Sequence, residues 1–279
     1  MSDFWEKQGK SDQKLKLNFI LFMERRKFVS SSILAASALA IGSNANAAEK
    51  KFAPKQVYEF REYEMKFGSN QAILHEYFEK SLIPALNKAG ITAIGAFREL
   101  GKSEPPKIYL LIPYSSLQNY NEVKEKLKSD PAYQASSQAY HQTPNPVYTR
   151  VSVSLLDAFD GLPQMAVPAK EPRIFELRTY EGYNEDAVRR KVKMFNDAEF
   201  PIFYKTKLTP VFFGEMIAGK NFPCLTYMVT FKNMEERDAN WKAFGADPDW
   251  KKTSADPQYA NTVSNIIRVF LEPMPYSQV

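Results

Sequence analysis

The stretch that decides the fold is Tyr58-Glu59-Phe60-Arg61-Glu62-Tyr63-Glu64, because it returns 117 residues later as Phe175-Glu176-Leu177-Arg178-Thr179-Tyr180-Glu181. The same shift relates further pairs: Pro84 and Pro201, Lys88 and Lys205, Asp130-Pro131 and Asp247-Pro248, and Tyr133 and Trp250. A shift that stays constant over this length requires structural elements of equal length in both copies. The chain therefore contains a tandem duplication.

Each copy predicts the order β-α-β-β-α-β. In the first copy the expected elements are a strand at 57–64, a helix at 69–89, strands at 91–97 and 108–114, a helix at 117–128, a helical stretch after Pro131, and a strand at 148–156. This order is typical of the ferredoxin-like split unit. We therefore expect an α+β fold with module 1 at 55–160, a Pro-rich linker at 161–171 and module 2 at 172–275.

The repeated opening strand resembles that of NIPSNAP domains, as do the proline-bearing first helix and the Asp-Pro-x-aromatic sequence at 130–133 and 247–250. The resemblance covers about residues 55 to 275. It implies the dimeric α/β-barrel fold, in which two such sheets face each other, so the two modules would close one barrel as a pseudo-dimer. It implies little chemistry, because that superfamily contains metal-free monooxygenases, haem-handling enzymes and isomerases.

Residues 23–47 have the three parts of a secretory signal peptide: the basic Arg25-Arg26-Lys27, a short apolar core and the end Ala45-Asn46-Ala47. The apolar core is shorter than the roughly 20 residues that span a bilayer, so no membrane anchor is expected after cleavage. The paired arginines resemble the twin-arginine (Tat) signal. We expect a periplasmic or secreted protein, and we interpret residues 1–22 as an upstream translation artefact.

The charge of the chain gives no support for a nucleic-acid partner. The formal net charge is +5, but residues 1–47 hold seven Lys or Arg and four Asp or Glu, which leaves the remainder at about +2. The single cysteine, Cys224, excludes an intramolecular disulfide and is interpreted as a small buried residue rather than a nucleophile.

Six polar residues of the repeated strand are the candidate ligand-binding residues. They are Glu59, Arg61 and Tyr63 in module 1, and Glu176, Arg178 and Tyr180 in module 2. Because strand side chains alternate, we expect these residues to face the barrel interior, with the other face of the strand against the helices. Guanidinium and phenol groups could then hold an anion or an enolate. The alternative is a structural ion-pair network. No catalytic residue is assigned.

The two histidines limit metal chemistry. His75 lies in the first helix without a second histidine at helical spacing, and we interpret it as a packing residue. His141 is the one candidate for a haem ligand, since some haem-degrading relatives bind iron through a histidine near the end of a comparable helix. Zinc-binding patterns are absent from the sequence, and we predict no cofactor.

Three functions stay open at this stage. The first is binding, or metal-free transformation, of a small organic ligand inside the barrel or between helices and sheet. The second is a non-catalytic structural or interaction module, and the third is haem binding. The sequence also leaves open a homo-oligomer.

Replacing both Arg25 and Arg26 by Lys should block export if the signal is of the Tat type, because the charge is kept while the paired guanidinium groups are lost. Cell fractionation followed by N-terminal sequencing tests this. The wild type should yield a periplasmic chain that begins at Ala48. An equally exported double variant would contradict the Tat assignment.

Overall fold

The computed structural model describes residues 54–101 and 104–279. The expected signal peptide at 23–47 and the segment 1–22 lie outside the described residues, so the export prediction stays a prediction. In the described part of the chain, no helix is both long and apolar enough to cross a membrane.

Both copies contain the same series of strands and helices, and the second copy adds a 3-10 turn before its last strand. The first is β1 (Val57–Met65), α2 (Ala72–Tyr77), a π-helical turn (Phe78–Leu82), α3 (Ile83–Lys88), β2 (Gly95–Glu99), β3 (Ile108–Tyr114), α4 (Leu117–Ser129), α5 (Pro131–His141) and β4 (Tyr148–Ala158). The second is β5 (Ile174–Glu181), α6 (Glu185–Met194), a π-helical turn (Phe195–Glu199), α7 (Phe200–Lys205), β6 (Thr209–Ala218), β7 (Cys224–Phe231), α8 (Met234–Ala246), α9 (Pro248–Ser254), a 3-10 turn (Pro257–Tyr259) and β8 (Asn265–Pro273).

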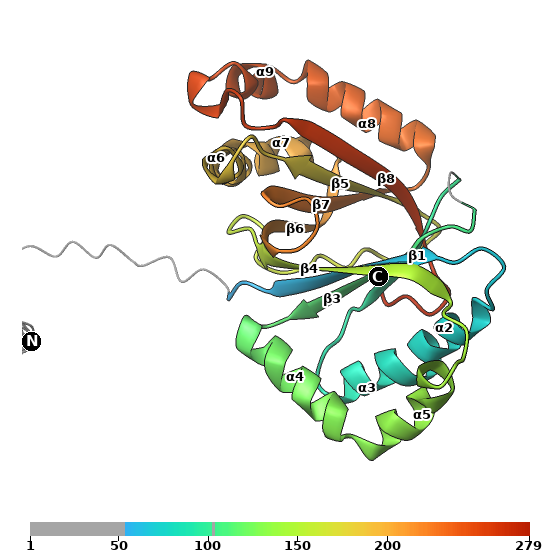
Figure 1. Ribbon diagram of the computed structural model, residues 1–279. Helices are drawn as coiled ribbons and strands as arrows, with labels where there is room; N and C mark the ends of the chain where they lie inside the picture. Colours follow the sequence, from blue (N-terminus) through green and yellow to red (C-terminus); the bar gives the residue numbers. More distant parts are fainter. Residues whose placement is uncertain (1–53, 102–103) are drawn as a thin grey trace, which may run out of the picture. The chain divides into compact units, whose positions relative to one another are not determined.

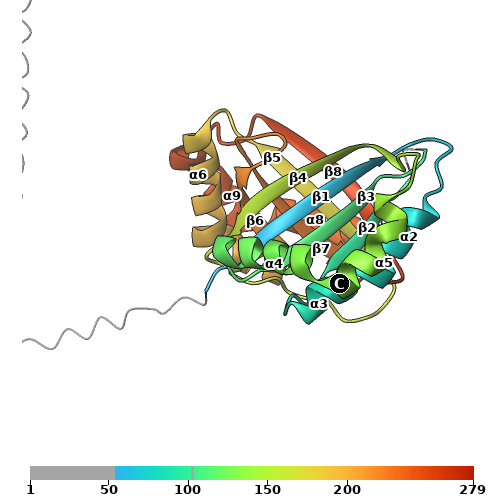
Figure 2. The ribbon, with the colours of Figure 1, turned by 60° about the horizontal axis from the view of Figure 1, so that its bottom comes forward.

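The eight strands form one closed antiparallel barrel in the order β1-β3-β2-β8-β5-β7-β6-β4. Two pairings, β2 with β8 and β4 with β6, join the modules. The helices of module 1 cover one side of the barrel and those of module 2 the opposite side (Figure 1). Figure 2 shows β4, β1 and β3 side by side in the wall, with α4 and α5 in front of it. The predicted barrel-type pseudo-dimer is confirmed.

Local signals at equivalent positions explain why the two copies fold alike. Ser116 caps α4 and Asn233 caps α8, each by accepting a backbone N–H of the first turn. Asp130 and Asp247 do the same for α5 and α9. Both aspartates also bind the lysine that ends the preceding α3 or α7, with Lys–Asp distances of 2.8 and 2.7 Å. The second strand begins at Gly95 rather than at Ile91, because Ala93 has a φ of 58°, outside the extended region.

The barrel interior is filled by an exchange of large and small residues between the copies. Gly95 and Phe212 occupy equivalent positions, and so do Phe97 and Gly214. A Cβ on Gly95 would lie 2.5 Å from the Phe97 ring, and one on Gly214 would lie 2.7 Å from Cβ of Leu156. Because neither glycine has room for a methyl group, the two modules are not interchangeable in this core.

The chain that follows each module's last strand crosses to the other module. Phe159 follows β4 and packs 5.8 Å, between ring centroids, from Phe195 in the helical core of module 2. Its equivalent Tyr276 follows β8 and lies 6.5 Å from Phe78 in module 1, with its hydroxyl 2.8 Å from Nδ1 of His75. These reciprocal contacts hold the modules together outside the barrel, and they give His75 the packing role expected from the sequence.

We expect Phe212→Ala to lower the free energy of unfolding by about 3–5 kcal/mol, because it leaves a cavity in the interior shared by both modules. Phe212 is fully buried, with its ring 5.2 Å from that of Tyr58 on β1. Urea unfolding measures the change. Phe67→Ala is the control: Phe67 is 81% exposed, and its loss should change stability by no more than about 0.5 kcal/mol.

Candidate functional site

The two faces of the repeated strand are the reverse of the prediction. Tyr58 and Phe60 lie in the apolar core shared by both modules, inside the barrel. Tyr63 packs instead with the helices of module 1, and Arg61 lies on the same face. The reason is that an eight-stranded barrel is filled by side chains, so its interior takes the more apolar set, whereas the helix-covered face is partly open at its edge.

The two groups of candidate residues therefore lie outside the barrel, on opposite sides of it. Glu59, Arg61 and Tyr63 lie between the sheet and the helices of module 1. Glu176, Arg178 and Tyr180 lie in the corresponding layer of module 2. The expectation that both groups meet inside the barrel is wrong, and each group must be considered within its own module.

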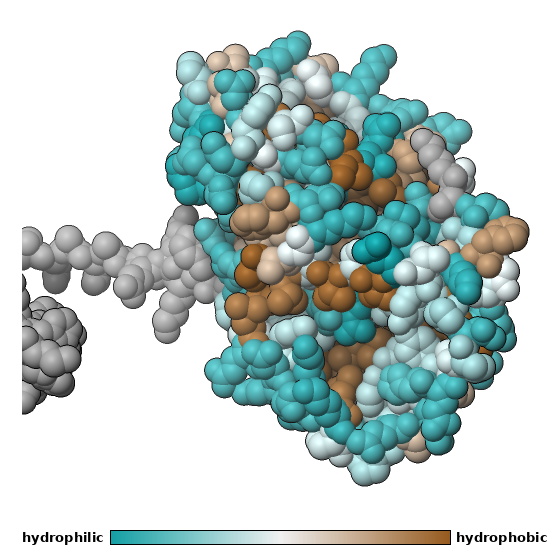
Figure 3. Space-filling view, viewed as in Figure 1, coloured by the Kyte–Doolittle hydropathy of each residue, from teal (hydrophilic) through white to brown (hydrophobic). Residues whose placement is uncertain are grey.

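Arg61 lines a cavity of about 390 Å³, which we call the helix–sheet cavity. Its lining residues are Arg61, Tyr77, Leu82, Lys124, Leu127, Lys128, Tyr133, Gln134, Ser137 and His141. Figure 3 shows apolar residues recessed in a hollow between the polar surfaces of α4 and α5. The structure thus brings together two residues that the sequence singled out separately, Arg61 and His141.

Arg61 is fixed at the floor of this cavity by Glu59. Its Nε and Nη2 donate to the two oxygens of the Glu59 carboxylate over 2.8 and 3.1 Å, and the Tyr114 hydroxyl donates to the same carboxylate over 3.0 Å. Burial disfavours the guanidinium charge, but Glu59 and Tyr63 together outweigh burial and raise the pKa of Arg61. A guanidinium has five N–H donors, so donors remain for Tyr63 and for a ligand.

Two tyrosine rings, Tyr77 and Tyr133, and His141 line one side of the cavity, and Tyr140 packs behind Tyr77. The Tyr77 ring stacks on Tyr140 with centroids 4.1 Å apart, and its hydroxyl lies 2.7 Å from that of Tyr133. His141 lies 5.8 Å from the Tyr77 ring, and its Nδ1 is 3.3 Å from the Ser137 hydroxyl. Burial raises the pKa of Tyr77, which keeps its hydroxyl protonated. Among the described residues that line the cavity, none is Asp or Glu.

The corresponding layer of module 2 is closed by aromatic side chains. Trp241 stands at the position of Lys124, and its ring covers the Arg178 guanidinium at 4.4 Å. The Trp241 indole N–H donates to Glu176 over 2.8 Å, and Arg237 binds the same carboxylate through two bonds of 2.8 and 3.1 Å. In the described residues, Nε of Arg178 is buried without a hydrogen-bond partner. Module 2 thus satisfies the Glu176 carboxylate with its own side chains and covers Arg178 with an aromatic ring.

A buried ion pair in module 2 was not found by the sequence analysis. Lys191 and Glu199 bind each other between the sheet and the helices, with side chains that are only 6% and 3% exposed. They stand where module 1 has Leu74 and Leu82. Burial raises the pKa of Glu199, although Lys191 opposes the shift. The joint change of two leucines into two opposite charges, at the repeat spacing, was the signal available in the sequence.

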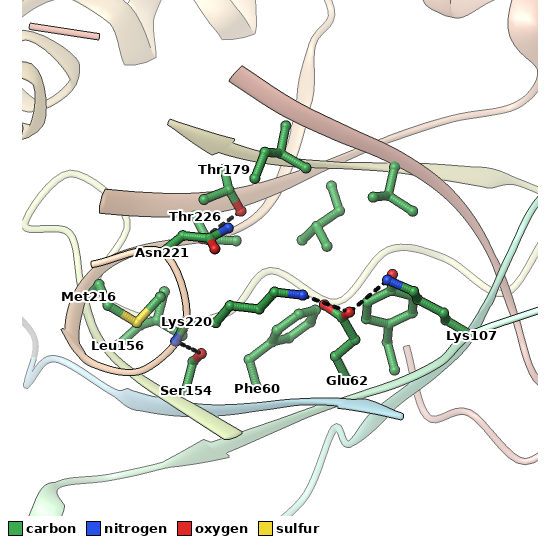
Figure 4. A pocket seen from close by; sticks show the side chains of 14 residues that line it. Phe60, Glu62, Lys107, Ser154, Leu156, Thr179, Met216, Lys220, Asn221 and Thr226 are labelled. Atoms are coloured by element: carbon green, nitrogen blue, oxygen red, sulfur yellow. Dashed lines mark hydrogen bonds and ion pairs between the residues drawn. The ribbon is translucent and has the colours of Figure 1, made fainter. Parts of the chain in front are cut away.

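The barrel-facing carboxylate of β1 is Glu62, at one end of the interior (Figure 4). It accepts hydrogen bonds from Lys107 of module 1 over 2.8 Å and from Lys220 of module 2 over 3.0 Å. Burial acts to raise the pKa of Glu62, but the two lysines outweigh burial and lower it.

Other candidate chemistries find little support. The residues that the structure describes contain no cluster of three or more His, Cys, Asp or Glu side chains suited to a metal ion. Cys224 is 1% exposed, as the sequence predicted, and burial raises the pKa of its thiol to about 12. A thiol in that state is a poor nucleophile.

Replacing Glu62 by Gln should make the free energy of unfolding vary less with pH in the acid range. A carboxyl group whose pKa is lowered by folding stabilises the folded state above its unfolded pKa of about 4.3, and that contribution is lost as the pH falls through the folded value. We expect the free energy of unfolding of Glu62→Gln to be about 1 kcal/mol below that of the wild type at pH 7, and this difference should shrink below about pH 4. Urea unfolding from pH 7 to 3 measures it, with the exposed Glu79→Gln as control. A constant difference across this range would contradict the assignment.

Comparison with known proteins places the chain in a family. The NIPSNAP family model matches residues 58–145 and 175–278. A candidate monooxygenase from Lactobacillus acidophilus is 11% identical, with a TM-score of 0.53 over 78% of this chain and 94% of that one. A second candidate monooxygenase, from Fusobacterium nucleatum, is 11% identical, with a TM-score of 0.50 over 78% and 92%.

A NIPSNAP protein of unknown function from Agrobacterium tumefaciens is 17% identical, with a TM-score of 0.34 over 38% of this chain and 91% of that one. No curated protein sequence matches the chain. The likeness to the two candidate monooxygenases shows the barrel fold alone. The family model covers both copies and most of the chain, and the chain therefore belongs to the NIPSNAP family.

Proposed function

We propose that this NIPSNAP protein binds a planar organic anion in the helix–sheet cavity of module 1. The observation that carries the proposal is the difference between the copies. In module 2 the flat indole of Trp241 covers Arg178, whereas in module 1 the equivalent residue is Lys124 and a cavity lies over Arg61. A planar ligand would take the place in module 1 that the indole takes in module 2.

The lining residues define the chemistry of the ligand. Arg61, Lys124 and Lys128 supply positive charge, and Gln134 and the tyrosines supply further donors. Leu82, Leu127 and the Tyr77 ring offer apolar surface for the body of the ligand. A volume of about 390 Å³ falls within the usual range of small-molecule sites, about 300–1,000 Å³. An aromatic carboxylate, phenolate or enolate matches this combination of groups.

The groups beside Arg61 can also move protons. Glu59 holds Arg61 rigidly, so the guanidinium can fix an oxyanion while the Tyr133 hydroxyl or His141 exchanges a proton with it. Proton transfer on a bound enolate or phenolate is therefore the reaction that these side chains support. The signal-like segment at 23–47 supports a periplasmic or secreted location for this activity.

Two substitutions in module 1 test the binding site, with 2-naphthoate as the probe in isothermal titration calorimetry. Arg61→Gln should weaken binding roughly tenfold to a hundredfold, because a hydrogen bond to a charged group contributes about 1.5–3 kcal/mol. Lys124→Trp should abolish binding, since it introduces the residue that covers the arginine in module 2. The neutral 2-naphthamide should bind more weakly than 2-naphthoate to the wild type.

Arg178→Gln is the matched control, because it makes the same change at the equivalent position of the closed module. It should leave the affinity for 2-naphthoate unchanged. Urea unfolding of all three variants separates loss of the site from loss of the fold. Equal loss of binding in Arg61→Gln and Arg178→Gln, or full binding in Lys124→Trp, would overturn the proposal.

Haem binding is the second candidate, and one observation favours it: His141 and Arg61 line the same cavity. If haem were bound, the His141 imidazole would supply a nitrogen ligand for the iron and the Arg61 guanidinium would pair with a carboxylate of the group. A Soret band after haem titration that is lost in His141→Ala but kept in His75→Ala would support this candidate. An unchanged spectrum in His141→Ala would remove it.

A further inference from the structure

The barrel encloses a second cavity, of about 180 Å³, which we call the barrel cavity. Comparison of the two modules explains this space. Three barrel-facing positions of module 2 carry smaller residues than the equivalent positions of module 1. The pairs are Leu177 for Phe60, Thr179 for Glu62 and Thr226 for Tyr109, and all six side chains line the cavity. The space thus results from specific substitutions rather than from loose packing of the whole interior.

The walls of the barrel cavity are apolar on most sides and polar at one end. Phe60, Leu177 and Met216 contribute to the apolar walls. Across the cavity from Glu62, the hydroxyl groups of Thr179 and Thr226 bind each other over 2.9 Å (Figure 4). A guest here would meet hydrocarbon along its body and hydrogen-bonding groups at its end.

Among the residues that line the cavity, Lys107 and Lys220 are cationic and Glu62 is anionic, while Glu64 and Glu99 act on Lys107 from outside the lining. Lys107 and Lys220 approach Glu62 from opposite sides, so two ammonium groups share one carboxylate (Figure 4). Each ammonium has three N–H donors, of which Glu62 accepts one. The remaining donors can serve an anion at the mouth of the cavity, where the attraction is stronger than in bulk water.

The position of Lys220 is fixed by the turn that carries it. Gly219 has a φ of 149°, a conformation that side-chain-bearing residues rarely adopt, and a Cβ there would lie 2.3 Å from Oγ of Ser154. The backbone N–H of Lys220 donates to the same Oγ over 3.3 Å. The hairpin between β6 and β7 is thereby held against β4, with Lys220 over the cavity.

From this geometry we propose that the barrel cavity is a binding site for a small carboxylate with a short apolar body. Its volume is about that of six water molecules in the liquid, which suits a chain of about four carbons and excludes the larger planar ligand proposed for the helix–sheet cavity. The carboxylate lies between Lys107 and Lys220, and the hydrocarbon extends toward Leu177. This site is formed by both modules and is independent of Arg61.

Calorimetry with butanoate tests the site, with butylamine as a probe of similar size and opposite charge. Butanoate should bind and butylamine should not. Lys220→Gln should weaken butanoate binding at least tenfold by removing one ammonium group. Leu177→Phe should do the same by filling the cavity with the residue of module 1, and it should not lower the midpoint of thermal unfolding. Thr226→Tyr is the equivalent variant if Leu177→Phe does not fold.

Arg61→Gln is the control, because it alters the helix–sheet cavity alone and should leave butanoate binding unchanged. Loss of binding in Arg61→Gln together with full binding in Lys220→Gln would place the carboxylate outside the barrel and overturn the proposal. Equal affinity for butanoate and butylamine would overturn it as well. So would a lack of binding to every straight-chain carboxylate from acetate to hexanoate at 10 mM.

Discussion

The closed barrel is the constraint on which the rest of the structure depends. Each module has a sheet with a strongly apolar face, and neither face can be left to water. The pairings of β2 with β8 and of β4 with β6 close the two sheets on each other, and Phe159 and Tyr276 then fasten each module to the helical core of the other. Barrel closure constrains only the inner face of each sheet, so the outer, helix-covered faces can differ between the two modules.

The two copies have used that freedom in opposite ways. In module 2 the strand carboxylate Glu176 is satisfied by Arg237 and Trp241, and the indole covers the arginine. In module 1 only Glu59 and neighbouring tyrosines engage Arg61, which leaves an accessible guanidinium beside aromatic rings. The helix-covered face of one copy is therefore closed by its own side chains, whereas that of the other has a cavity beside its arginine. A single chain allows this difference because its halves need not be identical.

The repeat made the element order and the barrel predictable, since a constant offset fixes element lengths and sets the family resemblance. The face of the strand was not predictable in the same way. Tyr58-Glu59-Phe60-Arg61-Glu62-Tyr63 places aromatic and charged residues on both sides, and its neighbour β3 is buried throughout, so alternation alone could not select the inner face. The meeting of Arg61 with His141 depends on how α5 packs against the sheet, which sequence spacing does not reveal. The exchange of Lys124 for Trp241 was visible in the aligned copies, but its meaning required the cavity.

The exchange of glycine and phenylalanine in the interior has a consequence for how the two halves fit together. Gly95 lies level with Phe212, and Phe97 lies level with Gly214, so each of these two layers of the barrel receives one ring and one gap. Two copies of the same half would put both rings in one layer and both gaps in the next, which would overfill the first layer and leave the second hollow. A chain that repeated one half exactly would lack this fit, so the two halves are complementary rather than interchangeable at these positions.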